Sequence, residues 1–199
     1  MKTSKNSSDL ESSIAGQPAS GSRRSFIRGA LGALLLGVTG TRSAQAFELF
    51  KTFQTPEAFI AETFGATPPP ASMLILDGAK QSQIASVFNR PYPQGRLRYW
   101  RAGGKTAWIF DDIGKEGYVE TTCGFVVRAG MIENARVLIY RESRGEQVGE
   151  PSFLKQLIGA KAAGNALDRR VDNISGATLS VKMMQRMART ALMLDTLAT

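Results

Sequence analysis

The stretch of this sequence best suited to hold an anionic group runs from Val171 to Ser180 and is rich in small and hydroxyl-bearing residues. It precedes a long helical pattern, and a helix N-terminus presents unpaired N–H donors and about half a positive charge, which favours phosphate. Gly176 and Ala177 leave room for a ligand to approach the backbone, while Ser175 and Thr178 supply hydroxyl groups. A plain helix cap is the alternative interpretation, because Ser and Asp commonly begin helices.

Two residue types are scarce, and this limits the chemistry of the chain. The sequence contains no histidine, which excludes His-liganded haem, His-containing zinc sites and His-based catalytic triads. Its one cysteine, Cys123, excludes an intramolecular disulfide and a four-cysteine iron–sulfur cluster. Cys123 lies in an apolar strand pattern and is predicted to be a buried, small hydrophobic residue. Any redox chemistry therefore requires an organic cofactor or one supplied by a partner, and no metal site is predicted.

The positive charge of the chain is spread along the sequence. Of the net charge of +8, residues 1–46 contribute six Lys or Arg and two acidic residues. The rest of the chain carries 19 basic and 15 acidic residues without a basic run. Nucleic acid is therefore not an expected partner.

The N-terminal 46 residues resemble a twin-arginine export signal. The paired arginines Arg23 and Arg24 precede Phe26, a Gly- and Ala-rich apolar run covers residues 29–40, and residues 44–46 read Ala-Gln-Ala, the pattern of a signal-peptidase site. The apolar run of 12 residues is too short to span a hydrocarbon core of about 30 Å. The resemblance implies export of a folded protein, to the periplasm or to the extracytoplasmic side of a membrane.

The remaining 153 residues have the size of one domain. Turn signals at residues 103–104 and 129–130 separate apolar segments into two predicted hairpins, and residues 73–76 form a short strand or the start of a helix. The pattern predicts an α+β fold, in which helices cover a small, mostly antiparallel twisted sheet. We expect strands over 97–101, 106–110, 118–128 and 132–140, and helices over 55–64, 81–88, 153–158 and 178–196.

Two residue pairs in the hairpin region are weaker candidates for a site. Asp111 and Asp112 are adjacent, so they would face opposite sides of a strand, and a turn suits them better than an acid/base pair. Trp100 and Trp108 flank the first hairpin and could shield a ring system, but packing in the core is favoured.

Residues 172–178 read Asp-Asn-Ile-Ser-Gly-Ala-Thr, and this Asp-x-x-Ser-Gly-Ala-Thr pattern resembles the covalent flavinylation motif of bacterial FMN-binding domains. Such domains occur in the C subunit of sodium-pumping NADH:quinone oxidoreductase and in the G subunit of the Rnf complex. The resemblance covers about residues 117–196. It includes a series of upstream elements in the family's order: Gly117-Tyr118, Val126-Val127, Gly130-Met131-Ile132, Val137-Leu138 and Glu142 to Gly149.

The resemblance implies that FMN is linked through its phosphate to the hydroxyl of Thr178, and that a flavin transferase installs it. Glu142 and Gly145 match an upstream loop that lies near the flavin in relatives. The family often reads Glu-Thr-Pro-Gly-Leu-Gly there, whereas this chain reads Glu-Ser-Arg-Gly-Glu-Gln over residues 142–147, a change that bears on the partner and the flavin potential. The rest of the recognition motif of the transferase consists of Asp172, Ser175, Gly176 and Ala177.

The sequence therefore predicts a signal peptide over 1–46, an N-terminal extension over 47–116 that packs on the domain, and an FMN-binding domain over 117–199. The resemblance implies an exported electron-transfer flavoprotein, or an oxidoreductase subunit without a visible substrate site of its own. Its partners would be membrane electron-transfer proteins, and association with a membrane is compatible with this role. The alternative is a reversibly flavin-binding or flavin-free scaffold module of a membrane redox complex.

Overall fold

The structure of the chain is a computed structural model that describes residues 50–114 and 119–199. The predicted export signal lies outside the described residues, as do Gly117 and Tyr118. None of the helices in the described part is long and apolar enough to cross a membrane.

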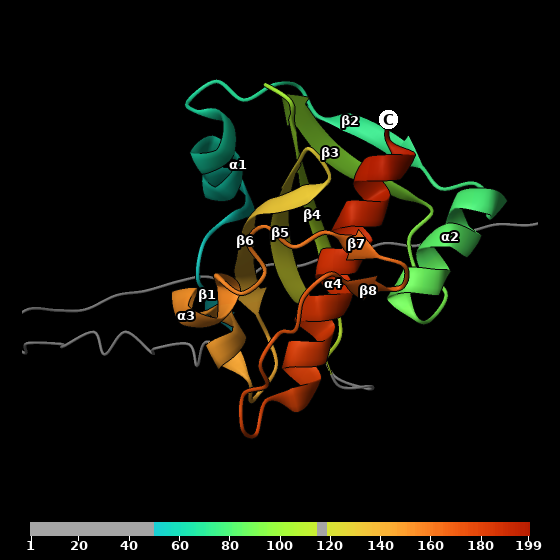
Figure 1. Ribbon diagram of the computed structural model, residues 1–199. Helices are drawn as coiled ribbons and strands as arrows, with labels where there is room; N and C mark the ends of the chain where they lie inside the picture. Colours follow the sequence, from blue (N-terminus) through green and yellow to red (C-terminus); the bar gives the residue numbers. More distant parts are fainter. Residues whose placement is uncertain (1–49, 115–118) are drawn as a thin grey trace, which may run out of the picture. The chain divides into compact units, whose positions relative to one another are not determined.

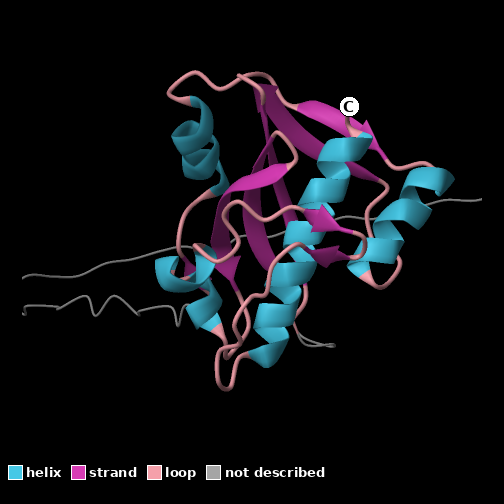
Figure 2. Ribbon diagram, in the orientation of Figure 1, coloured by secondary structure: helices cyan, strands magenta, loops and turns pink. Residues whose placement is uncertain are grey.

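One antiparallel sheet of six strands is the centre of the described fold, and Figures 1 and 2 show helices on both of its faces. The strand order is β1-β6-β5-β4-β3-β2, so strands that neighbour one another in the sheet mostly neighbour one another in sequence. This architecture confirms the predicted α+β class. The strands are β1 Lys51–Thr52, β2 Ser72–Ile75, β3 Arg96–Ala102, β4 Lys105–Asp112, β5 Thr121–Arg128 and β6 Met131–Tyr140.

Both predicted hairpins are confirmed, and each has a two-residue turn. Gly103 and Gly104 join β3 to β4 with φ of 58° and 73°. Ala129 and Gly130 join β5 to β6 with φ of 49° and 72°. Left-handed backbone at both turn positions matches the twist of the flanking strands, which is why glycine is favoured there.

Two of the helices begin at a side-chain cap. Helix α1, Pro56–Phe64, is capped by Thr55, whose hydroxyl accepts a hydrogen bond from the N–H of Ala58 at 3.1 Å. Helix α2, Gly78–Phe88, starts three residues earlier than predicted because Asp77 caps it by accepting from the N–H of Lys80 at 3.0 Å. The terminal helix α4, Thr178–Leu197, has almost the predicted bounds.

The helix predicted over 153–158 is wrong in its extent. Only α3, Pro151–Leu154, is helical, and it follows the short 3₁₀ helix η1, Glu146–Gly149. Beyond α3 the backbone instead bonds to β6: Gly159 donates to the Ile132 carbonyl at 2.7 Å, and Ile132 donates to the Ala160 carbonyl at 2.9 Å. A small hairpin of β7, Ala162–Ala163, and β8, Ala166–Leu167, follows.

The main hydrophobic core lies between the sheet and the helices α2 and α4. Met184 and Met187 are fully buried there, in agreement with a core-facing side of α4, and the predicted burial of Cys123 is confirmed. A smaller cluster under α1 on the other face includes Phe59 and Leu138. The sheet therefore has one well-covered face and one that α1 covers only in part.

The structure corrects the prediction that Asp111 and Asp112 lie in a turn, because both belong to β4. Their side chains do face opposite sides: Asp112 is buried against α4, and Asp111 lines a cavity on the α1 side. Trp108 is fully buried in the main core, as favoured, and stacks on Tyr99 at a ring distance of 5.0 Å.

Candidate functional site

The N-terminus of α4 is open to solvent and lacks a side-chain cap. Gly176 turns the chain into the helix with φ of 80°, and the N-cap residue Ala177 makes no side-chain hydrogen bond. Neither Ser175 nor Asp172 takes over this role, so a plain helix cap does not account for these residues. The first N–H groups of a helix have no intrahelical partner, and here they stay available to a ligand.

Thr178, the first residue of α4, presents its hydroxyl at the surface. Its Oγ1 accepts a hydrogen bond from Asn173 Nδ2 at 2.9 Å. Asn173 was not among the predicted site residues, because the motif pattern places no requirement on its position. This contact orients the threonine side chain without using the hydroxyl proton.

A cavity of about 480 Å³ adjoins Thr178, within the range typical of sites for small ligands. Two segments that are distant in sequence form its walls, namely the loop after β6 and the start of α4. The lining residues are Glu142, Ser143, Arg144, Gly176, Ala177, Thr178, Leu179 and Ser180.

The predicted site residues divide into two groups. Glu142, Gly176, Ala177 and Thr178 line this cavity together, whereas Asp172, Ser175 and Gly145 are not among its lining residues. Asp172 is exposed; its backbone N–H donates to Gln156 Oε1 at 2.8 Å, and its carboxylate lies 3.9 Å from Arg170 Nε. Ser175 is exposed in the turn before the helix.

Glu142 is the acidic group of the cavity and is half-buried. Its Oε1 accepts a hydrogen bond from the backbone N–H of Gly114 at 2.7 Å. Burial raises the pKa of Glu142 above its ordinary value, and the nearby charge of Asp112 acts in the same direction. A β-carbon at Gly114 would lie 2.5 Å from Glu142 Oε1, so a larger residue there would displace the Glu142 carboxylate from its present position.

Gly145 holds the loop after β6 against α4. Its φ is 94°, and a β-carbon at this position would lie 2.1 Å from Ser180 Oγ and 2.8 Å from the Tyr140 hydroxyl. That hydroxyl donates to the carbonyl of Arg144 and is 3.0 Å from Ser180 Oγ. Burial raises the pKa of Tyr140 to about 12, so the phenol keeps its proton. The role of Gly145 is thus to let the two cavity walls meet.

Four lining residues were not among the predicted site residues. Arg144 supplies a positive charge, Leu179 an apolar surface that is 46% exposed, and Ser143 and Ser180 each a hydroxyl group. Their types suit a ligand that combines an anionic group with an apolar body. The charged loop over residues 142–147 was the only sequence signal for Arg144.

Comparison with known families gives one match, to a sequence model that covers part of the chain. Residues 114–193 match the sequence model of a family described as FMN-binding domain. The matched range includes every lining residue of the cavity as well as Asp172 to Thr178. No curated protein and no solved structure gives a significant match to the chain.

Proposed function

Because residues 114–193 match the FMN-binding domain family, we propose that the chain carries FMN covalently, linked through the phosphate to Thr178, and acts as an exported electron-transfer flavoprotein. The observation that supports this proposal is the position of Thr178. Its hydroxyl is exposed at an uncapped helix N-terminus, beside a cavity whose other wall contains Arg144 and Glu142.

The residues present fit a phosphoester at Thr178. Forming the ester replaces the hydroxyl proton by phosphorus, and the Asn173 amide can still donate to the remaining oxygen. The remaining negative charge would lie in the first turn of α4, where the helix dipole stabilises an anion by about 0.3–1 kcal/mol. Arg144 adds a cation on the opposite wall. Gly176 has no atom within 4 Å of a β-carbon position, so the approach to this turn is unobstructed.

FMN when bound supplies the redox chemistry, and the chain supplies position and electrostatics. Leu179 offers an apolar contact at the cavity wall, and Arg144 counters negative charge. Glu142 is the acidic residue that lines the cavity, and burial raises its pKa. Gly145, Tyr140 and Ser180 keep the two walls together.

The proposed partners follow from the family and from the N-terminal sequence. A flavin transferase would recognise Asp172 to Thr178 and attach the cofactor. The twin-arginine pattern over residues 1–46 supports a location in the periplasm or at the extracytoplasmic side of a membrane. There the protein would relay electrons between membrane and extracytoplasmic redox proteins, without binding nucleic acid.

A mass measurement tests the attachment. The protein is co-expressed with a flavin transferase, denatured and analysed by intact mass and peptide mapping. We expect an added mass of one FMN less water on Thr178, its loss in Thr178→Ala, and its retention in Ser143→Ala, which removes another hydroxyl of the cavity. Flavin that leaves on denaturation would favour reversible binding, and a protein that never binds flavin would favour the scaffold alternative.

A further inference from the structure

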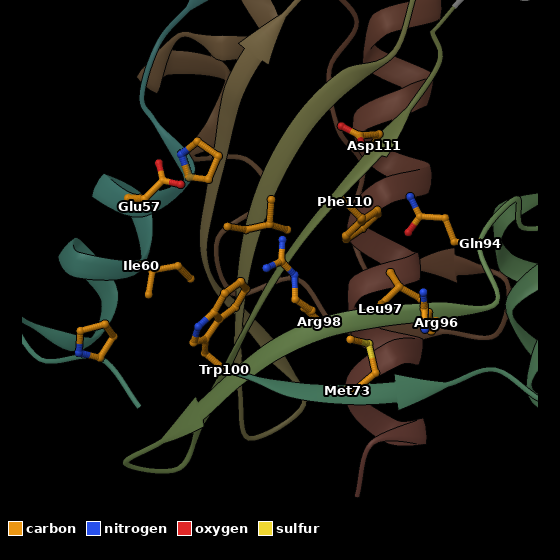
Figure 3. Close-up of a pocket in the computed structure, with 13 residues that line it drawn as sticks. Glu57, Ile60, Met73, Gln94, Arg96, Leu97, Arg98, Trp100, Phe110 and Asp111 are labelled. Carbon is orange, nitrogen blue, oxygen red and sulfur yellow. The ribbon is translucent and has the colours of Figure 1, made fainter. Parts of the chain in front are cut away.

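A second cavity, of about 630 Å³, lies on the side of the sheet that α1 covers only in part. Figure 3 shows α1 along one side of it, β3 across its floor, and Met73 of β2 at its border. Trp100 and Arg98 extend from β3 into this region. This surface is separate from the cavity at Thr178 and has no role in the proposed flavin site.

The strand β2 that borders this cavity is an edge strand whose outer side is unpaired. It is the last strand in the sheet order, and no other described strand bonds to it except β3. The Leu76 N–H donates to the Gly95 carbonyl at 2.9 Å, and hydrogen-bonded pairs alternate along an antiparallel ladder. By this alternation Leu74 bonds to β3, whereas Met73 and Ile75 direct their N–H and C=O groups outward.

The same two residues also expose their side chains. Met73 is 48% and Ile75 58% exposed, and both are among the few large apolar side chains at the surface of the described residues. Edge strands are usually protected by charges or proline, but β2 reads Ser-Met-Leu-Ile. An apolar edge with outward backbone groups is a template for adding a strand.

The charges beside this edge indicate which kind of partner strand could be added to it. In the register of β2 and β3, Arg98 lies opposite Met73 and Arg96 opposite Ile75. Both arginines are exposed, and neither makes an ion pair or side-chain hydrogen bond within residues 50–114 and 119–199. The two carboxylates of the same cavity lie farther from this edge, Glu57 on α1 and Asp111 on β4, which is separated from β2 by β3. The charge directly beside the β2 edge is therefore positive.

We propose that the β2 edge and the adjoining cavity bind an extended segment of a partner protein in which acidic and apolar residues alternate. The segment would add a seventh strand beside β2, with its backbone bonded to Met73 and Ile75 and its acidic side chains reaching toward Arg96 and Arg98. A second copy of the chain does not suit this edge, because pairing β2 with β2 would offer no acidic side chain from β2 or β3 to Arg96 and Arg98. A small anion alone would leave the outward backbone groups unused.

Peptide binding to the purified protein tests the charge preference. The probe is a fluorescein-labelled nonapeptide of alternating Glu and Val, compared with its Lys–Val counterpart by fluorescence anisotropy. We expect saturable binding of the acidic peptide only, and a loss of about tenfold or more in affinity in the Arg96→Glu and Arg98→Glu variants. Lys155→Glu, at an exposed position on the segment after α3, is the matched control and should leave the affinity unchanged.

A backbone variant tests the edge itself. Ile75→Pro removes an outward N–H but no ladder bond to β3, so the strand can be kept while the added strand loses a donor. Ile75→Thr keeps the N–H and serves as its control. We expect weaker binding in the first variant and near-normal binding in the second. Equal affinity for both peptides, no binding at all, or an unchanged affinity in Ile75→Pro would overturn the proposal. So would a dimer by sedimentation that Ile75→Pro abolishes.

Discussion

At the scale of single residues, the cavity beside Thr178 depends on a very close approach between the loop after β6 and α4. Gly145 allows this approach because its backbone is left-handed and Ser180 occupies the space that a β-carbon would need. The Tyr140 hydroxyl bonds to both segments at the same point. A residue that only supports the walls can thus control the geometry in which Thr178 is presented.

The Gly145→Ala variant should be strongly destabilised. A β-carbon there would lie 2.1 Å from Ser180 Oγ at φ of 94°, so strain and overpacking together should lower the free energy of unfolding by about 2–4 kcal/mol. Urea denaturation measures this loss. Gly95→Ala is the control, because Gly95 has open space around it and no left-handed backbone. Equal midpoints for the two variants would contradict the assigned role of Gly145.

Glu142 should make stability depend on pH in a defined direction. Its pKa is raised in the folded state by burial, so its contribution to stability is full below the ordinary value of 4.5 and is lost as pH rises through the folded pKa. The Glu142→Gln side chain cannot ionise and can still accept from the Gly114 N–H. We expect the stability of this variant relative to wild type to increase between about pH 4 and about pH 7, as measured by denaturation at each pH. A difference that shrinks over this interval would contradict the prediction.

At the scale of elements, one buried carboxylate ties the end of β4 to two helices. The Asp112 side chain has no exposed surface and bonds to Arg186 Nε of α4 at 2.7 Å. It also pairs with Arg90, just after α2, and accepts from the Ile113 N–H at 2.7 Å. Because Arg186 donates in turn to the Ile113 carbonyl, this cluster fixes α4 against the end of β4.

Removing Asp112 should loosen this arrangement. Asp112→Ala leaves two guanidinium groups without their shared partner, and breaking such a buried pair costs about 3–5 kcal/mol. Chemical denaturation should show this loss. The neighbouring Asp111→Ala is the matched control: its carboxylate lies on the opposite face with one hydroxyl donor, so a much smaller effect is expected. Similar losses for the two variants would contradict a special contribution of the arginine cluster to stability.

At the scale of the whole molecule, the segment matched to the family shares its sheet with the segment before it. Strands β4 and β5 pair over eight residues, from Lys105 opposite Arg128 to Asp112 opposite Thr121. The main core likewise combines residues of both segments, such as Trp108 with Met187. The family match begins at residue 114, after β4 has ended.

A fragment of residues 114–199 should therefore fail to fold by itself. It would expose the long edge of β5 and the apolar face of α4 that packs on α2 and β4. We expect no cooperative thermal transition for this fragment by circular dichroism, and a cooperative one for residues 50–199. A cooperative transition in the shorter fragment would instead support an independent domain with a dispensable extension.

The sequence by itself determined the class, the two hairpins and three of the four α-helices, although α2 starts earlier than predicted. These elements depend on local chemistry: glycine in the tight turns, Thr55 at the start of α1, and the spacing of apolar residues along α4. The helix predicted over 153–158 was too long. Beyond α3 the backbone bonds to β6 instead, and this contact joins residues that are distant in the chain.

The motif around Thr178 was visible in sequence for the same reason, since its residues are contiguous. What only the tertiary structure decided is how distant residues meet. It placed Glu142 and Arg144 across a cavity from Thr178, and it set Tyr140 against Ser180. It also left the edge of β2 unpaired beside two arginines. Strand order and close packing arise from contacts between segments, and no local propensity specifies them.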